Sequence, residues 1–152
     1  MAGTKLDKTS LEIVRLLQNG RISFKEIGRA VGLSEATVRT KVTRLTSEGL
    51  VDIKALVSTK DMEVGYNLAY VGVRLKSPAM KDVAEAISTL RGVISVAIVT
   101  GRYDLMLTIM LAPDFSLMDF FEEMLAKQGD NISLNETFMV YESVNLKTPY
   151  PF

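Results

Sequence analysis

The clearest hydrophobic pattern in the chain lies in residues 33–49. Its apolar residues Val38, Val42 and Leu45 are spaced by four and three positions, which places them on one face of a helix. Ser34 is a favoured N-cap residue, and the glycine that ends the stretch is a favoured helix stop. The pattern therefore predicts a helix with one buried stripe and polar residues on its other faces.

Two shorter amphipathic stretches, residues 6–17 and 23–31, precede this helix. The first has Asp7 as its predicted N-cap, and its apolar positions are Leu6, Ile13, Leu16 and Leu17. The second is joined to the long helix by a glycine turn, and its predicted stripe comprises Phe24, Ile27, Ala30 and Val31. Three helices in this order, the last one basic, predict a helix-turn-helix whose final helix enters the major groove of DNA.

From residue 50 onward the hydrophobic period changes to that of β-strands. Apolar and polar residues alternate over 50–59, which predicts a strand, and a polar segment at 60–65 ends in glycine. We therefore expect a helix-turn-helix domain at residues 1–50, a linker strand acting as a hinge at 51–65, and a second domain at 66–152.

The second domain shows alternating strand and helix patterns. Strands are predicted at residues 66–75, 93–100, 105–111 and 132–146, and helices at 77–90 and 114–127. Asp114 is the expected cap of the second helix, whose predicted inward-facing residues are Phe115, Met118, Phe121, Met124 and Leu125. The order βαββαβ predicts a ferredoxin-like sandwich, with two helices on one face of four antiparallel strands. The fold class is thus α+β, with an N-terminal three-helix winged or helix-turn-helix domain.

Such a sheet has one face without helices, and that face needs a partner. We expect it to expose Val96, Ile98 or Met106 and Leu107, and to pack against the same face of a second copy, which makes a homodimer. The tail at residues 148–152 is extended by its prolines. A frayed end is the preferred interpretation of this tail over a latch onto a neighbouring subunit.

Composition narrows the possible chemistry. The chain has neither cysteine nor histidine, which excludes disulfides, thiolate zinc sites and cysteine nucleophiles and removes the commonest acid–base group. No apolar run approaches the roughly 20 residues of a membrane span, and the first residues lack the apolar region of a signal peptide. We therefore expect a cytoplasmic protein without membrane contact.

The charge is unevenly distributed although its sum is zero. Residues 1–60 hold 11 Lys and Arg against 6 Asp and Glu, whereas residues 61–152 hold 7 against 12. The first part can attract phosphates and the second would repel them. DNA is therefore the predicted partner of the first part alone.

The third predicted helix and the segment before it supply the candidate DNA contacts. The residues expected on the groove side are Glu35, Ala36, Arg39, Thr40 and Thr43, with Arg39 as the predicted guanine contact. The residues expected near phosphates are Ser23, Lys25, Ser34, Thr37, Lys41 and Arg44. Lys25 and Lys41 are equally well explained as solvated surface lysines. A two-fold dimer implies a palindromic operator in double-stranded DNA.

The sequence resembles the Lrp/AsnC (feast/famine) family of prokaryotic transcription regulators over nearly its whole length. In the first half the likeness lies in residues 6–7, 13–17, 19–27, 31–39, 44–45 and 48–51. In the second half it lies in residues 93–96, 100–105 and 135–137. The resemblance implies a helix-turn-helix joined by a strand to a ferredoxin-like (RAM-type) effector domain. It also implies dimers that assemble into octamers, with a small amino acid bound where dimers meet.

The same resemblance implies an effector site at the turn of residues 101–104 and at the start of the last long strand. Carried over by motif, its residues are Thr100, Gly101, Tyr103, Asp104, Asn135 and Thr137. A zwitterionic ligand needs a carboxylate for its ammonium, which Asp104 supplies in this interpretation, and donors for its carboxylate. The alternative is structural, with Gly101 forming the hairpin turn and Asp104 bonded to that turn's own backbone. Arg102 and Asn135 depart from the family's usual residues, which leaves the identity of the ligand open.

These observations predict a sequence-specific DNA-binding transcription regulator, modulated by a free amino acid, that is no enzyme and needs no cofactor or metal. One alternative is an architectural protein that coats DNA without a chosen operator. A second is a haem-precursor decarboxylase, since Lrp-like folds also occur there. That resemblance relies on histidines, and this chain has none.

Overall fold

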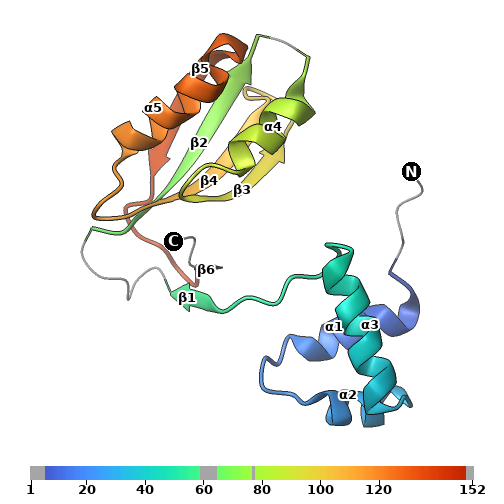
Figure 1. The fold of residues 1–152 in the computed structure, drawn as a ribbon. Helices are drawn as coiled ribbons and strands as arrows, with labels where there is room; N and C mark the ends of the chain where they lie inside the picture. The colour runs from blue at the N-terminus through green and yellow to red at the C-terminus, as the bar shows by residue number, and fades with distance from the viewer. Residues whose placement is uncertain (1–5, 59–64, 77, 150–152) are drawn as a thin grey trace. The chain divides into compact units, whose positions relative to one another are not determined.

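The computed structural model describes residues 6–58, 65–76 and 78–149, and the chain forms two compact units, residues 1–54 and 55–152 (Figure 1). The predicted polar segment 60–65 lies outside the described residues except for its final glycine. No helix in the described part is long and apolar enough to cross a membrane.

The first unit consists of three helices, which confirms the prediction. They are α1 (Lys8–Leu17), α2 (Phe24–Val31) and α3 (Glu35–Ser47). Asp7, Ser23 and Ser34 cap them, each accepting a backbone N–H of the first turn. The hydrogen bond from the Ser10 backbone N–H lowers the pKa of Asp7, and those from the Ser23 hydroxyl and backbone N–H lower the pKa of Glu26.

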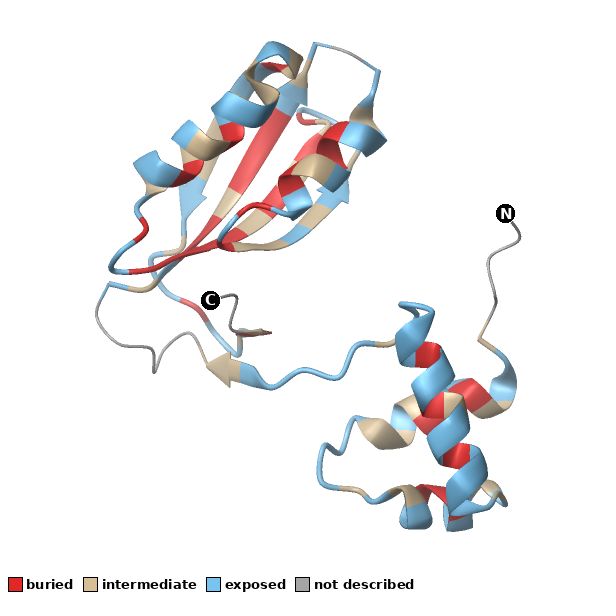
Figure 2. Cartoon of the chain, in the orientation of Figure 1, coloured by how far each residue is buried: buried red, intermediate tan, exposed pale blue. Residues whose placement is uncertain are grey.

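The core of this unit is formed by one apolar stripe from each helix, drawn red in Figure 2. Its fully or nearly fully buried members are Ile13, Ile27, Val38 and Val42, and Leu45 is buried as well. The predicted stripe of α2 is wrong at Ala30, which is exposed. Successive residues of a helix are about 100° apart around its axis, so Ala30 does not share a face with Val31. Gly28 is buried instead of Ala30.

Gly28 sets the distance between α2 and the turn into α3. It is buried, its carbonyl accepts the Leu33 backbone N–H at 2.9 Å, and a Cβ placed on it would lie 2.5 Å from the Leu33 carbonyl oxygen. Gly32 ends α2 with a φ of 70°, in the left-handed region that favours glycine. The glycine turn thus brings the two helices together through backbone contacts that a larger residue at position 28 would prevent.

The second unit is the predicted ferredoxin-like sandwich. In chain order its elements are β2 (Asn67–Leu75), α4 (Met80–Ser88), β3 (Val93–Ile98), β4 (Leu105–Leu111), α5 (Leu117–Gln128), a 3-10 turn (Gly129–Asn131) and β5 (Ile132–Met139). The strands form an antiparallel sheet in the order β3-β4-β2-β5. Both helices lie on the same face of the sheet (Figure 1), and the core between them contains Val71, Val73, Leu107 and Phe120.

The start of α5 differs from the prediction. Ser116, not Asp114, caps the helix, in a capping box with Asp119 whose hydrogen bonds from Ser116 lower the pKa of Asp119. Asp114 instead pairs with Arg91 at 2.7 Å, and this contact lowers its pKa. Met118 and Leu125, both predicted to face inward, are exposed, whereas Phe120 and Met124 are fully buried.

The residues predicted for the helix-free face are also partly wrong. Leu107 is fully buried in the core beneath the helices, and Val96, directly opposite it on β3, packs against the same core. Ile98 is opposite Leu105, another core residue, so its side chain belongs to the helix side of the sheet edge. Met106 alone of the four lies on the helix-free face, because side chains alternate along a strand.

The strand predicted at 50–59 is regular only at β1 (Leu56–Ser58). It pairs antiparallel with β6 (Lys147–Pro149). The long strand predicted at 132–146 is shorter in the structure, because β5 ends at Met139. The frayed-end interpretation is wrong for Thr148, which is buried, and for Pro149, which is opposite Leu56. Residues 150–152 lie outside the described part.

We predict that Gly28→Ala destabilises the first unit by about 1–3 kcal/mol, because the added methyl group would lie 2.5 Å from the Leu33 carbonyl oxygen and the backbone would have to shift. Gly20→Ala is the matched control, since no atom lies within 4 Å of a Cβ there. Urea unfolding of both variants, followed by helical circular dichroism, measures the difference. Equal stability of the two variants would contradict the close packing described for the turn.

Candidate functional site

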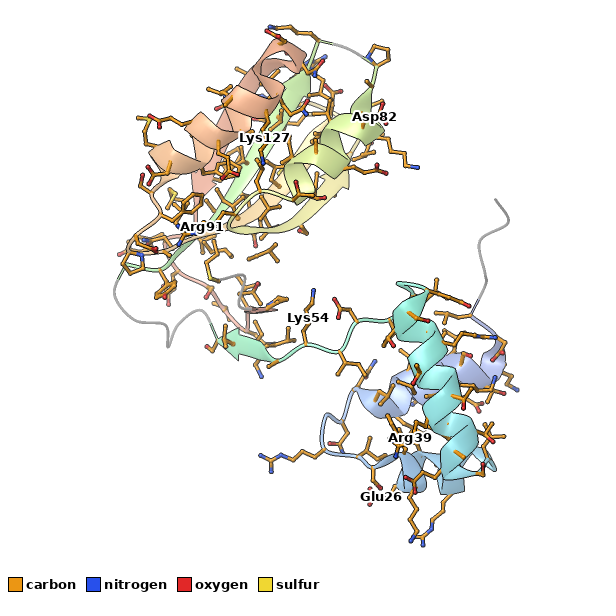
Figure 3. All side chains as sticks on the ribbon, in the orientation of Figure 1. Glu26, Arg39, Lys54, Asp82, Arg91 and Lys127 are labelled. Carbon is orange, nitrogen blue, oxygen red and sulfur yellow. The ribbon has the colours of Figure 1, made fainter. Side chains whose placement is uncertain are left out.

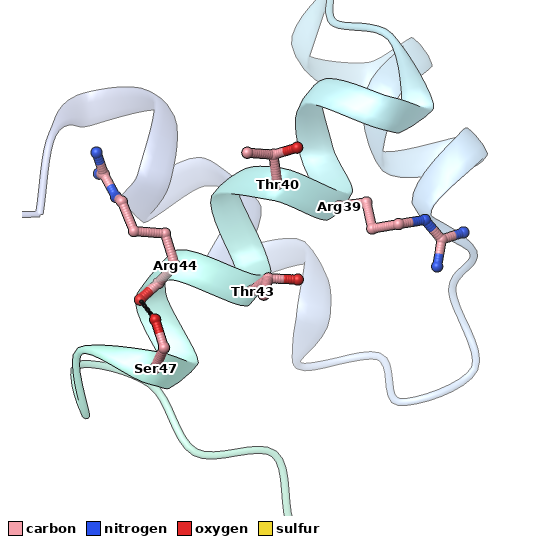
Figure 4. A pocket seen from close by; sticks show the side chains of 5 residues that line it. All are labelled: Arg39, Thr40, Thr43, Arg44 and Ser47. Atoms are coloured by element: carbon pink, nitrogen blue, oxygen red, sulfur yellow. Dashed lines mark hydrogen bonds between the residues drawn. The ribbon is translucent and has the colours of Figure 1, made fainter.

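The outer face of α3 carries an open groove of about 420 Å³, shown in Figure 4. Its lining residues are Arg39, Thr40, Thr43, Arg44 and Ser47. The two arginines extend to opposite sides of this face, and Thr43 lies between them (Figure 4). Four of the five lining residues were predicted as DNA contacts, so the structure brings these four together on one surface.

Both arginines of the groove are solvent-accessible. The Arg39 side chain is 62% exposed, lies 3.0 Å from Glu35 and has its guanidinium 5.2 Å from the centre of the Phe24 ring. Arg44 is 51% exposed and lies 3.8 Å from Glu48. Exposed pairs of this kind are worth about 0–1 kcal/mol. They orient the guanidinium groups and can be exchanged for a phosphate or a base edge.

Two hydroxyl groups of the groove donate hydrogen bonds to backbone carbonyls of their own helix. Thr40 donates to the Ala36 carbonyl at 3.0 Å and Ser47 donates to the Arg44 carbonyl at 2.9 Å, which leaves the lone pairs of both oxygens available. Ser47 was not predicted. Its position four residues after Thr43, on the same helical face, is the signal that identifies it.

The other predicted DNA contacts lie outside the groove. Ser23 and Ser34 are caps, and the Ser34 hydroxyl lies 2.8 Å from that of Thr37. Lys25 and Ala36 are exposed. Lys41 is only 26% exposed, and its ammonium lies 3.5 Å from Asp7 at the start of α1. This lysine therefore connects two helices of the unit.

Figure 3 shows Glu26 and Arg39 on the first unit and Asp82, Arg91 and Lys127 on the second.

A second candidate site lies on that second unit, at the turn between β3 and β4. Thr100 and Gly101 are exposed, and Gly101 has a φ of 118°. The Asp104 backbone N–H donates to the Val73 carbonyl at 2.9 Å, and its carboxylate accepts the Leu75 backbone N–H at 2.8 Å. The Asp104 side chain is therefore bonded to the backbone of the neighbouring strand, not to that of its own turn.

The turn folds back over the helix-free face of the sheet. Tyr103 is 8% exposed, and its ring covers Gly72, where a Cβ would lie 2.6 Å from the ring. The Tyr103 hydroxyl donates to the Glu136 carboxylate on β5, which also lies 3.2 Å from the Arg102 guanidinium. Arg74 donates to the Arg102 carbonyl at 2.9 Å. We call Arg74, Arg102, Tyr103 and Glu136 the turn cluster.

The structure does not bring all the predicted effector residues together. Thr137 is opposite Val71 and Asn135 opposite Val73, whose side chains lie in the core on the helix side. Glu136, between them, is opposite Gly72 and faces the other side, with Tyr103. Asn135 and Thr137 are therefore separated from the turn cluster by the sheet within one chain. Glu136 lies inside the motif of residues 135–137 but was not named as a site residue, because its contact with Tyr103 spans 33 residues and no local pattern indicates it.

The described residues include no group of three or more carboxylates that could hold a metal ion. Instead, each candidate site contains an arginine paired with one carboxylate. Arg39 and Glu35 are both exposed, whereas the exposed Arg102 pairs with the half-buried Glu136. This arrangement can bind an anion or a zwitterion.

Comparison with known proteins adds two family matches. Residues 6–46 match the AsnC-type helix-turn-helix domain, and residues 68–150 match the Lrp/AsnC ligand binding domain. The chain is 34% identical over 136 residues to the uncharacterised HTH-type transcriptional regulator PH0140 of Pyrococcus horikoshii, covering 88% of this chain and 84% of that protein. It is 34% identical over 121 residues to the HTH-type transcriptional regulator Ptr1 of Methanocaldococcus jannaschii, covering 78% and 80%.

Among solved structures, the L-Met complex of transcriptional regulator NMB0573 from Neisseria meningitidis has a similar fold. Its TM-score is 0.63 at 23% sequence identity, and the match covers 97% of each chain.

We predict that Gly72→Ala destabilises the second unit by about 1–3 kcal/mol, because the methyl group displaces the Tyr103 ring from the sheet. The cost should largely disappear when the same substitution is made in a Tyr103→Ala background. Denaturant unfolding of the four proteins of this cycle measures the coupling between the two positions. Additive effects would show that the ring does not rest on Gly72.

Proposed function

Since the chain belongs to the Lrp/AsnC family of transcriptional regulators and carries that family's ligand-binding domain, we propose that it is a cytoplasmic regulator that binds a palindromic operator. In this proposal α3 lies in the major groove, two copies bind one operator, and a free amino acid modulates assembly or DNA affinity. The observation that carries the proposal is the exposed groove of α3, with an arginine at each side.

The groove supports base recognition by Arg39. Its guanidinium is exposed, and the Glu35 carboxylate and the Phe24 ring hold it near the start of the recognition helix, where helix-turn-helix proteins contact bases. A bidentate arginine contact selects guanine. Arg44, on the other side of the groove, is suited to a phosphate, and the Ser34 cap places backbone N–H groups at the start of α3 for another.

The helix-free face of the sheet supports a dimer. Leu134 and Phe138 share this face of β5 with Glu136, and their side chains are 47% and 45% exposed. Met106 and Tyr70 lie on the same face and are half-buried. A second copy that covers this face would remove these side chains from water, which is the usual driving force for homodimers. The octamer that the family resemblance implies is part of the same proposal.

The effector role rests on the family match of residues 68–150 and on the turn between β3 and β4. We place the amino acid at this turn, near Thr100, Gly101, Tyr103 and Asp104. The related regulator solved with L-Met shows that a protein of this fold binds an amino acid. The predicted residues Asn135 and Thr137 face the helices, so within one chain they are not part of the same cluster.

We predict that Arg39→Ala weakens operator binding by about 1–3 kcal/mol and relaxes the preference at one base pair of each half-site. Arg44→Ala should weaken binding to all sequences alike and reduce the salt dependence of log K by about one. Selection of DNA from a random library, followed by gel-shift titration at several stated salt concentrations, measures both effects.

Lys127→Ala is the control for these DNA measurements, since Lys127 is an exposed cation on the second unit that pairs only with Glu123 among the described residues. It should leave DNA affinity unchanged. Equal affinity of the unmodified protein for selected and random DNA would overturn operator recognition and favour a DNA-coating protein.

We predict that the purified protein is at least a dimer and that Phe138→Glu shifts it toward monomer, because the substitution places a charge in the apolar interface. Met118→Glu, on the exposed side of α5, should retain the dimer. Sedimentation velocity of the three proteins distinguishes these outcomes. A monomeric unmodified protein would overturn the proposed interface.

A further inference from the structure

Glu35 is a carboxylate beside a surface that is otherwise suited to a polyanion. It lies one turn before Arg39 on α3, and its side chain is 47% exposed. Phosphate oxygens repel a carboxylate, so the DNA backbone offers Glu35 no favourable partner. In the major groove, by contrast, cytosine and adenine carry amino groups that can donate to a carboxylate. Glu35 is therefore better suited to a base than to a phosphate.

Glu35 and Arg39 together present an ordered row of hydrogen-bonding groups. The Arg39 Nη2 nitrogen donates to Glu35 Oε1 at 3.0 Å, which uses one of several N–H donors of the guanidinium. The guanidinium can therefore make two further hydrogen bonds without releasing Glu35. Its flat side lies over the Phe24 ring, 5.2 Å from the ring centre, which leaves the edges for hydrogen bonds. The pair thus offers two donors followed by one acceptor.

A G·C base pair presents the complementary row in the major groove. Guanine offers the acceptors N7 and O6, and cytosine offers its N4 amino group beside them. O6 and N4 share a Watson–Crick hydrogen bond and are therefore about 2.9 Å apart, which is close to the 3.0 Å between the Arg39 and Glu35 atoms. An A·T pair presents an acceptor, a donor and an acceptor instead, so its central amino group would meet a guanidinium donor.

We propose that Glu35 and Arg39 together read one G·C base pair in each half-site of the operator. Arg39 donates to guanine N7 and O6, and Glu35 accepts from the cytosine N4 amino group. This inference rests on the proposed operator recognition and adds Glu35 as a specificity-determining residue. Because the Glu35 carboxylate repels phosphates, it also lowers the affinity for random DNA and so increases the discrimination.

The experiment uses the full-length protein and a duplex selected from a random library. We expect one G·C pair of each half-site to lose its preference in Arg39→Ala. At that pair, 7-deazaguanine removes the N7 acceptor, N4-methylcytosine blocks the amino hydrogen on the groove side, and inosine removes only the minor-groove amino group. Gel-shift titration at one stated salt concentration should show about tenfold weaker binding for the first two and unchanged binding for inosine.

Protein variants assign each loss to a side chain. In Glu35→Ala, N4-methylcytosine should no longer weaken binding, and the affinity for random DNA should not fall. In Arg39→Ala, 7-deazaguanine should no longer weaken binding. Glu48→Ala is the matched control, since Glu48 pairs with Arg44 at the same spacing on α3, 3.8 Å away. It removes the same charge and should retain both losses. Circular dichroism melting verifies that each variant is folded.

The outcomes separate this inference from the proposed function. If selected and random DNA bind equally well, operator recognition itself is overturned. If an operator is recognised and N4-methylcytosine has no effect, or weakens binding equally in the folded Glu35→Ala variant, operator recognition stands and the role of Glu35 is overturned. A Glu35 that only stabilises the start of α3 by its negative charge would give this second result. An A·T pair at the position that depends on Arg39 also overturns the inference.

Discussion

Side chains alternate between the two faces of a strand, and this constraint assigns every group of the second unit to one of two environments. Val71 and Val73 on β2 point into the core, so Gly72 between them points to the helix-free face. The same rule turns Glu136 toward Tyr103 and its neighbours Asn135 and Thr137 toward the helices. The chemistry of the turn cluster is therefore a consequence of how β2 and β5 are paired.

The second constraint is the close approach of other groups to the backbone, which glycine allows because it has no side chain. At Gly28 the approaching group is the Leu33 carbonyl, and the contact sets the geometry of the turn into α3. At Gly72 it is the Tyr103 ring, and the contact holds the turn between β3 and β4 against the sheet. Neither glycine has a positive φ, so their role is space rather than backbone conformation. In each unit, a glycine leaves the space that the packing next to the candidate site requires.

The amino-acid sequence predicts the elements well where the local signal is strong. Asp7 and Ser34, the two predicted N-caps, are helix caps in the structure, and so is Ser23, which was not predicted as one. It predicts α5 less well because Asp114 and Ser116 are both good capping residues. The choice depends on Asp119, which completes the capping box with Ser116, and on Arg91, which pairs with Asp114 from a distant part of the chain.

Contacts between distant segments account for the remaining errors. The pairing of β1 with β6 joins residues about ninety positions apart, and nothing in the alternation over 50–59 specifies that partner. Leu107 was placed on the wrong face because an almost wholly apolar strand, LMLTIML, has no polar residue at alternate positions to mark the outer side except Thr108. Glu136 was missed for a related reason, since its contact with Tyr103 spans 33 residues.

The two candidate sites share one arrangement of side chains. Arg39 is held by the Glu35 carboxylate and the Phe24 ring, and Arg102 is held by the Glu136 carboxylate and the Tyr103 ring. The ring supports the flat face of the guanidinium and the carboxylate takes its edge, so the side chain is oriented before any ligand arrives. The difference lies in where the carboxylate comes from. Glu35 lies one turn before Arg39 on the same helix, whereas Glu136 belongs to β5 and also accepts the Tyr103 hydroxyl. The first pair therefore orients a side chain on one helix, and the second joins the turn between β3 and β4 to the sheet.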